Sequence, residues 1–179
     1  MIALALLAAL TGAPDGLRLE GGVFGALPAS LETGQVLGPS LTALWTRDIL
    51  SLGLRARLGT VDEDATNHEV HHTELRFAAL AGLRQRIGRG ELGLDLSAGA
   101  VIVREDRLIH LAARYPNPER TEGWRTGPQI ALDASVRLFV IEGWGLAIEG
   151  GPSLAFMPDV ALRVGWSGGI SVVYAPGDG

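Results

Sequence analysis

The chain has 179 residues, of which 47% are hydrophobic and 20% charged, and its formal net charge is −5 at pH 7. This length favours one domain, and the acidic balance excludes the basic surface typical of nucleic-acid-binding proteins. The sequence contains no cysteine, which excludes disulfide frameworks, thiolate metal sites and cysteine nucleophiles.

An apolar run at residues 2–10 opens the chain, and small residues follow it at positions 11–14. A short apolar run that ends in small residues is typical of a secretory signal. The sequence therefore predicts a signal segment, truncated at its basic end, over residues 1–13 and a single barrel domain over residues 14–179. A buried N-terminal helix or strand is the alternative.

Hydrophobic and polar residues alternate with a period of two in residues 49–60, where apolar positions from Leu50 to Leu58 are separated by serine, glycine and arginine. This period indicates a β-strand with one apolar and one polar face. The sequence repeats the pattern in four further segments and, less regularly, in three more: 92–102, 130–140, 144–156, 162–174, 17–27, 36–46 and 70–86. Eight strands are therefore expected.

The connections between these predicted strands alternate in length. Glycine and polar residues at positions 47–48, 88–90 and 142–143 predict tight hairpin turns. Longer polar stretches at 28–35, 61–69 and 105–123 are expected to be loops, and 157–159 is a further short connection. Short turns at one rim and long loops at the other are typical of an up-and-down meander.

The polar face of the predicted strands combines small residues with charges of both signs. An eight-stranded barrel has an interior just wide enough for side chains, so this face is expected to form an ion-paired lumen. The predicted lumen network consists of Arg55, Arg57, Glu74, Arg76, Asp95, Asp133, Arg137, Glu149 and Arg163.

The other face carries large apolar residues, and no helix is predicted that would cover it. Closing the sheet removes its edges, and lipid is then the natural partner of the apolar face. Trp45, Trp144 and Tyr174 share this face and the short-turn rim. Their placement predicts an aromatic girdle of the kind found at membrane interfaces.

In architecture, residues 17–174 resemble the small eight-stranded outer-membrane barrels of the OmpA and OmpX type. The resemblance implies an all-β fold, an antiparallel up-and-down transmembrane barrel, in the cell envelope of a Gram-negative bacterium. It implies periplasmic termini and short turns, and external long loops. The partners it implies are outer-membrane lipid, lipopolysaccharide, the barrel-assembly machinery and an unidentified loop partner; no cofactor or metal is expected.

Three short motifs suggest chemistry that their surroundings do not support. Residues 68–72 match the zinc-protease pattern H-E-x-x-H, but both histidines reach one Zn²⁺ only on a helix; a surface loop is expected instead. Residues 88–93 match G-x-G-x-x-G, yet an alternating strand follows where a dinucleotide site needs a helix. Residues 165–169 match G-x-S-x-G, but no histidine follows as hydrolase order requires.

The favoured hypothesis is a non-enzymatic outer-membrane barrel with a plugged lumen and a structural or surface-interaction role. One alternative is a lipid-modifying barrel enzyme, for which His71, His72 and Glu74 are the candidate residues. The other is a soluble periplasmic, lipocalin-like barrel that binds a small apolar ligand. This second alternative reverses the faces, so that leucines line a cavity while Arg55, Arg57 and Asp133 face water.

Overall fold

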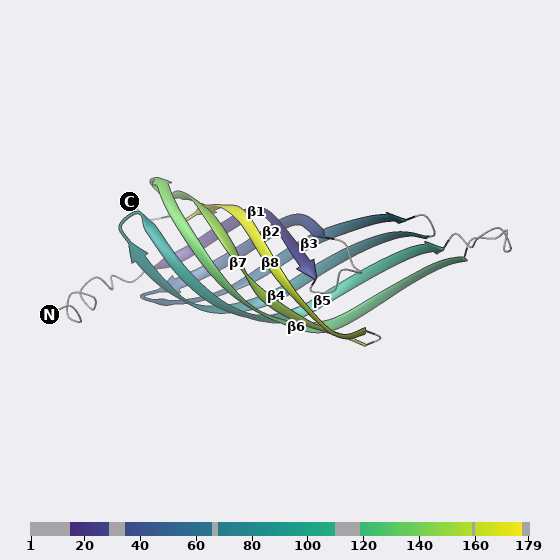
Figure 1. Cartoon of the computed structure of the whole chain (residues 1–179). Coiled ribbons are helices and arrows are strands. Elements are labelled where there is room, and N and C mark those ends of the chain that lie inside the picture. The colour runs from purple at the N-terminus through teal and green to yellow at the C-terminus, as the bar shows by residue number, and fades with distance from the viewer. Residues whose placement is uncertain (1–14, 29–34, 66–67, 110–118, 159, 177–179) are drawn as a thin grey trace.

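A computed structural model describes residues 15–28, 35–65, 68–109, 119–158 and 160–176. Eight antiparallel strands follow one another in sequence order and close into a barrel, with the last strand paired to the first (Figure 1). The strands are β1 (Gly16–Pro28), β2 (Val36–Arg47), β3 (Leu50–Ala65), β4 (His68–Ile87), β5 (Gly90–Ile109), β6 (Glu119–Ile141), β7 (Trp144–Met157) and β8 (Val160–Tyr174). The predicted eight-stranded up-and-down barrel is confirmed. Among the described residues there is no helix long and apolar enough to cross a membrane.

Tight turns join three strand pairs at one end of the barrel, which we call the inner end. Two residues separate β2 from β3, β4 from β5, and β6 from β7. Asp48, Gly88 and Gly143 in these turns have φ values of 54°, 62° and 73°. Two-residue hairpin turns require such left-handed conformations, which glycine and aspartate tolerate. The predicted tight turns are confirmed.

Four neighbouring strands continue beyond the closed barrel at the other, outer end (Figure 1). Strands β3 to β6 have 16 to 23 residues, whereas β1, β2, β7 and β8 have 12 to 15. Pairing persists to Ala65↔His68 between β3 and β4 and to Ile109↔Glu119 between β5 and β6. We call this extension the projecting sheet; it comprises residues 61–65, 68–74, 103–109 and 119–126.

The projecting sheet corrects two of the predicted loops. Residues 61–69 and 105–123 were expected to be loops, but most of them belong to strands. Polar residues occupy both faces of this extension, so the period-two hydrophobic signal disappears while backbone pairing continues. The H-E-x-x-H segment, residues 68–72, was likewise expected in a surface loop, but it lies in β4.

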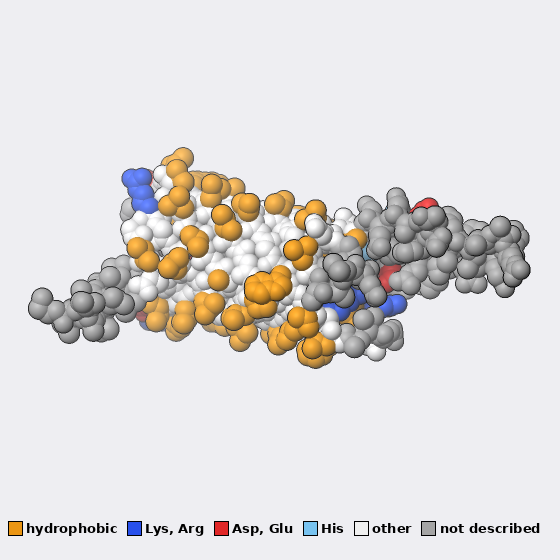
Figure 2. All heavy atoms as spheres, in the orientation of Figure 1, with side chains coloured by type: hydrophobic (Ala, Val, Ile, Leu, Met, Phe, Trp, Pro, Cys, Tyr) orange, Lys and Arg blue, Asp and Glu red, His pale blue; other side chains and the backbone are white. Residues whose placement is uncertain are grey.

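The apolar residues of the alternating pattern point outward on all eight strands, and Figure 2 shows them on one side of the barrel body. Leu54, Leu96 and Ile148 are 68%, 59% and 63% exposed. The reversed faces expected for a soluble ligand-binding barrel are therefore wrong, since Arg55 is 5% and Asp133 0% exposed. The lumen-facing positions hold small residues and paired charges because a narrow interior has room for little else.

Candidate functional site

The inner end of the lumen is closed by apolar side chains. Phe139, Ala147, Val173 and Ala175 form a buried cluster at the ends of β6, β7 and β8. The guanidinium carbon of Arg18 lies 5.6 Å from the centre of the Phe139 ring, a cation–π contact that joins this cluster to the charged layer above it.

Six charged residues follow next along the lumen and form the inner ionic cluster: Arg18, Glu20, Arg84, Glu91, Asp95 and Arg137, each at most 2% exposed. Arg137 Nε donates to Glu20 Oε1 at 2.7 Å, and Arg84 Nη2 donates to both Asp95 oxygens at 2.6 Å. Arg18 pairs with Glu91. Three arginines thus meet three carboxylates, so the buried charges balance.

Two lumen-facing glycines make room for the pair between Arg84 and Asp95. A Cβ atom at Gly82 would come 2.1 Å from Asp95 Oδ1, and one at Gly93 would come 2.3 Å from Arg84 Nη1. Any larger residue would displace a charged group from its partner. The high glycine content therefore has a packing role inside this narrow barrel.

Farther along the lumen, four residues form the outer ionic cluster: Arg55, Arg57, Asp133 and Glu149. Arg55 donates to Asp133 at 2.6 Å and to Glu149 at 2.5 Å, and Arg57 donates to Glu149 at 2.5 Å. Asp133 lies directly opposite Asp95 in the register of β5 and β6. Like charges in such positions repel, and each carboxylate is neutralised by its own arginine: Asp95 by Arg84 and Asp133 by Arg55.

Nearer the outer end, Arg76 Nε donates to Glu74, and His72 Nε2 lies 3.4 Å from the other Glu74 oxygen. The structure therefore brings eight of the nine predicted lumen residues into ion pairs. Arg163 is the exception: it faces the lumen from β8 without an ion pair to any residue that the structure describes.

Sequence reasoning missed four members of the inner ionic cluster: Arg18, Glu20, Arg84 and Glu91. Arg18 and Glu20 alternate with the outward-facing Leu17 and Leu19. Strand parity alone therefore places them in the lumen, and this signal was present in the sequence.

Aromatic side chains lie on the outer surface at both ends of the apolar belt. Trp45, Trp144 and Tyr174 form the inner aromatic row and are 48%, 49% and 38% exposed; the rings of Trp144 and Tyr174 lie 4.7 Å apart. A second row, which the sequence analysis did not identify, lies toward the outer end: Trp124, Phe156 and Trp166, exposed by 68%, 48% and 63%.

The distance between the two aromatic rows along the barrel axis can be derived from the length of β7. Phe156 follows Trp144 by 12 residues on β7, which is about 40 Å along a strand at ~3.3 Å per residue. A strand tilted by about 45° then spans ~28 Å along the barrel axis, close to the ~25 Å height of the apolar band in outer-membrane barrels.

The residues proposed for the enzyme alternative do not share one face. His71 is exposed on the outer surface of β4, whereas His72 and Glu74 are buried on its inward-facing side. Ser167 of the G-x-S-x-G match lies within the continuous strand β8, not at a strand-to-helix turn, and accepts a 3.4 Å hydrogen bond from Arg57. Within the described ranges, no group of three His, Asp or Glu side chains is placed to hold a metal ion.

No protein-family model and no curated protein sequence matches the chain. Among solved structures it is similar to Neisserial surface protein A (NspA), with 12% identity, a TM-score of 0.65, and coverage of 90% of this chain and 97% of that one. It is also similar to Ail, the attachment invasion locus protein of Yersinia pestis, solved with the heparin analogue sucrose octasulfate; the identity is 12%, the TM-score 0.56, and the coverage 90% and 99%. Both are small eight-stranded outer-membrane barrels, so the resemblance drawn from the sequence is confirmed at the level of the fold.

Proposed function

We propose that this chain is an outer-membrane protein whose barrel is plugged by ion pairs and which has a structural or surface-interaction role in the cell envelope. The observation that carries this proposal is the apolar belt on the outside of a closed barrel. Every strand contributes large exposed apolar residues to the belt; one from each is Leu19, Leu41, Leu54, Phe77, Leu96, Leu132, Ile148 and Ile170.

A surface of this kind is unfavourable in water. The largest apolar patch on a typical soluble monomer covers about 300–600 Å², and burying one leucine-sized side chain contributes about 1.5–3 kcal/mol. A closed barrel has no further sheet edge to pair, and lipid acyl chains can cover its belt on all sides. The two aromatic rows lie at the edges of this belt, where headgroups would meet their rings.

The filled lumen supports a role other than transport. Both ionic clusters lie across the interior, and all ten of their residues are at most 9% exposed. The apolar cluster around Phe139 closes the inner end behind them. A continuous water path would have to break several buried ion pairs, so we propose that the barrel does not conduct.

The projecting sheet supports a role at the cell surface. It extends beyond Phe156 and Trp166 of the outer aromatic row, includes Trp124, and carries exposed polar groups such as His71, Arg104 and Glu122. We propose that it lies among the lipopolysaccharide headgroups and presents the loops to an external partner, after insertion by the barrel-assembly machinery. The likeness to a surface protein and to an attachment protein supports this assignment.

The test is fractionation of cells that express the chain behind a working signal sequence, followed by SDS gels of unheated and boiled samples. We expect the protein in the outer-membrane fraction, with a band whose mobility changes on boiling. A soluble periplasmic protein with one mobility would contradict the proposal. A membrane protein that nevertheless passes ions in planar bilayers would overturn only the plugged lumen.

A further inference from the structure

Two arginines face each other across neighbouring strands in the outer half of the lumen. Arg57 on β3 lies directly opposite Arg76 on β4 in the strand register, and both line the same small cavity. The other residues that line it are Arg55, Ala78, Ser97, Gln129, Ala131, Ser153 and Ser167. We propose that this cavity binds one small inorganic anion of about the size of chloride.

The first argument is charge. Side chains that are directly opposite on antiparallel strands have Cβ atoms about 4.5–5.5 Å apart, and like charges there are destabilising. Arg76 has Glu74 as its partner, and Arg57 pairs with Glu149, which also accepts from Arg55; Asp133 is the further partner of Arg55. None of the residues that line the cavity is a carboxylate. The lining of the cavity therefore combines three arginines with neutral side chains and contains no anionic group.

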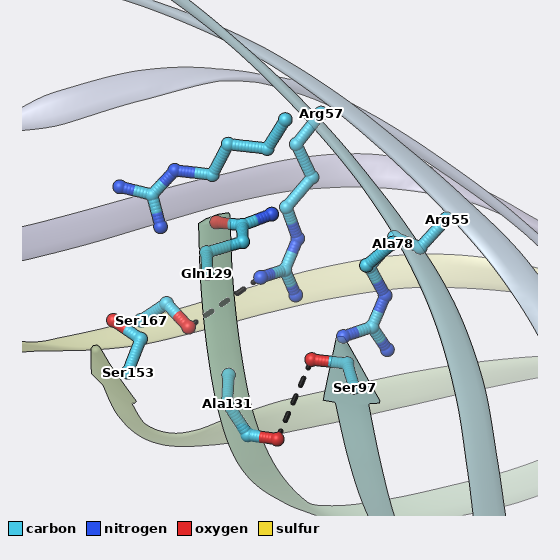
Figure 3. Close-up of a pocket in the computed structure, with 9 residues that line it drawn as sticks. Arg55, Arg57, Ala78, Ser97, Gln129, Ala131, Ser153 and Ser167 are labelled. Carbon is cyan, nitrogen blue, oxygen red and sulfur yellow. Dashed lines mark hydrogen bonds between the residues drawn. The ribbon is translucent and has the colours of Figure 1, made fainter. Parts of the chain in front are cut away.

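The second argument is an unused donor. Arg57 is 5% exposed, and its Nε has no hydrogen-bond partner in the structure. Its Nη1 makes only a long 3.4 Å bond to Ser167, and Figure 3 shows the guanidinium beside Gln129, with this bond as a dashed line. A buried N–H without an acceptor is unfavourable, and an anion in this cavity would supply that acceptor.

The third argument is size. The cavity offers about 20 Å³ to the centres of water-sized molecules, and one water needs roughly 10–15 Å³ on the same measure. This volume suits a single halide ion and is too small for a sugar or a nucleotide. Because the site lies inside the barrel, the inference does not depend on where in the cell the protein resides.

The experiment measures the midpoint temperature of thermal unfolding of the purified full chain in detergent. Unfolding is detected on SDS gels as the loss of the band seen in unheated samples. Sodium chloride replaces sodium gluconate at constant ionic strength, because gluconate is too large for the cavity. We expect the midpoint temperature to rise with chloride and to saturate. Equal midpoints in chloride and gluconate would overturn the proposal.

Two variants locate the effect. Arg76→Gln removes one of the facing cations and should abolish the saturable response, whereas Arg163→Gln removes a lumen arginine that does not line the cavity and should leave the response intact. A response that persists in Arg76→Gln would contradict the site.

A third variant tests the proposal in case Arg76→Gln does not fold. Ser153→Ala keeps every charge and adds no volume, but removes a hydroxyl that lines the cavity, and it should weaken chloride binding by about tenfold, as the loss of one hydrogen bond to an ion predicts. Unchanged chloride affinity in Ser153→Ala would count against the proposal. Crystals grown with bromide should show an anomalous peak between Arg57 and Arg76, and the absence of a peak there would also overturn it.

Discussion

Arginine–carboxylate pairs occur in two regions of the molecule that differ in exposure. In the inner ionic cluster the side chains of Arg84 and Asp95 are both 0% exposed. On the projecting sheet the side chains of Arg104 and Glu122 are 49% and 45% exposed, and Arg104 also lies 5.7 Å from the Trp124 ring centre. Exposed pairs contribute about 0–1 kcal/mol, whereas a buried charge left without its partner costs about 3–5 kcal/mol. Arginine–carboxylate pairs therefore contribute to the stability of the barrel interior in one region, whereas in the other region they mainly keep a surface polar.

The largest loss in the free energy of unfolding is expected where a buried arginine is removed. Arg137→Met leaves Glu20 and Glu91 without this partner in the lumen, and we expect the free energy of unfolding to fall by about 3–5 kcal/mol. Urea unfolding of the barrel in lipid vesicles measures it. The double variant Arg137→Met/Glu20→Leu should recover part of the loss, since it removes one unpaired carboxylate. A single-variant loss below about 1 kcal/mol, the range of exposed pairs, would contradict the distinction.

A charge placed on the apolar belt should have the next largest effect. Leu94 faces outward from β5 and is 46% exposed, and Leu94→Arg should cost about 2–4 kcal/mol if this position lies near the middle of a bilayer. Leu108→Arg is a matched control, because Leu108 has the same outward parity on β5 but lies on the projecting sheet. The same vesicle assay applies, and equal costs for the two variants would argue against a lipid-covered belt.

A smaller effect is expected from one methyl group in the lumen. Gly93→Ala would place a carbon 2.3 Å from Arg84 Nη1, and overpacking of this kind costs about 1–3 kcal/mol. Gly21→Ala is the control, since a Cβ atom there meets nothing within 4 Å. Chemical denaturation of both variants should separate them; a neutral Gly93→Ala would show that Arg84 moves without loss.

The smallest effect is expected on the projecting sheet. Arg104→Gln removes an exposed ion pair with Glu122 and a cation–π contact with Trp124, and we expect it to change the free energy of unfolding by about 0–1 kcal/mol. The change should shrink further in high salt, because exposed charges are screened. A loss comparable to that of Arg137→Met would mean that this region is buried by something that covers it.

The strands of the barrel body could be predicted because each has one apolar and one polar face. Leu92 to Ile102 and Ile130 to Val140 alternate without interruption, and both segments lie in strands. The projecting sheet could not be predicted in this way. His71 and Asp106 are directly opposite in β4 and β5 and make the outward face polar there, while the inward face is polar as well. Hydrophobic periodicity therefore carries no information about backbone pairing in this part of the sheet.

The sequence could predict which residues face the lumen, but it could not predict which partner each of them meets. Parity along each strand assigns a side chain to the lumen or to the outside. Arg137 and Glu20, however, are 117 residues apart in the chain and meet only because β8 pairs with β1. Barrel closure therefore selects which carboxylate each arginine meets, and no local pattern contains that information.

The sequence by itself determined the number of strands, the position of the tight turns and the apolar and polar faces, because each depends on neighbours one or two residues away. The tertiary structure alone decided how far β3 to β6 project, which charges neutralise one another, and that Arg57 and Arg76 face a common cavity. These features depend on the register between strands and on the closure of the sheet, and both arise from contacts between segments that are distant in the chain.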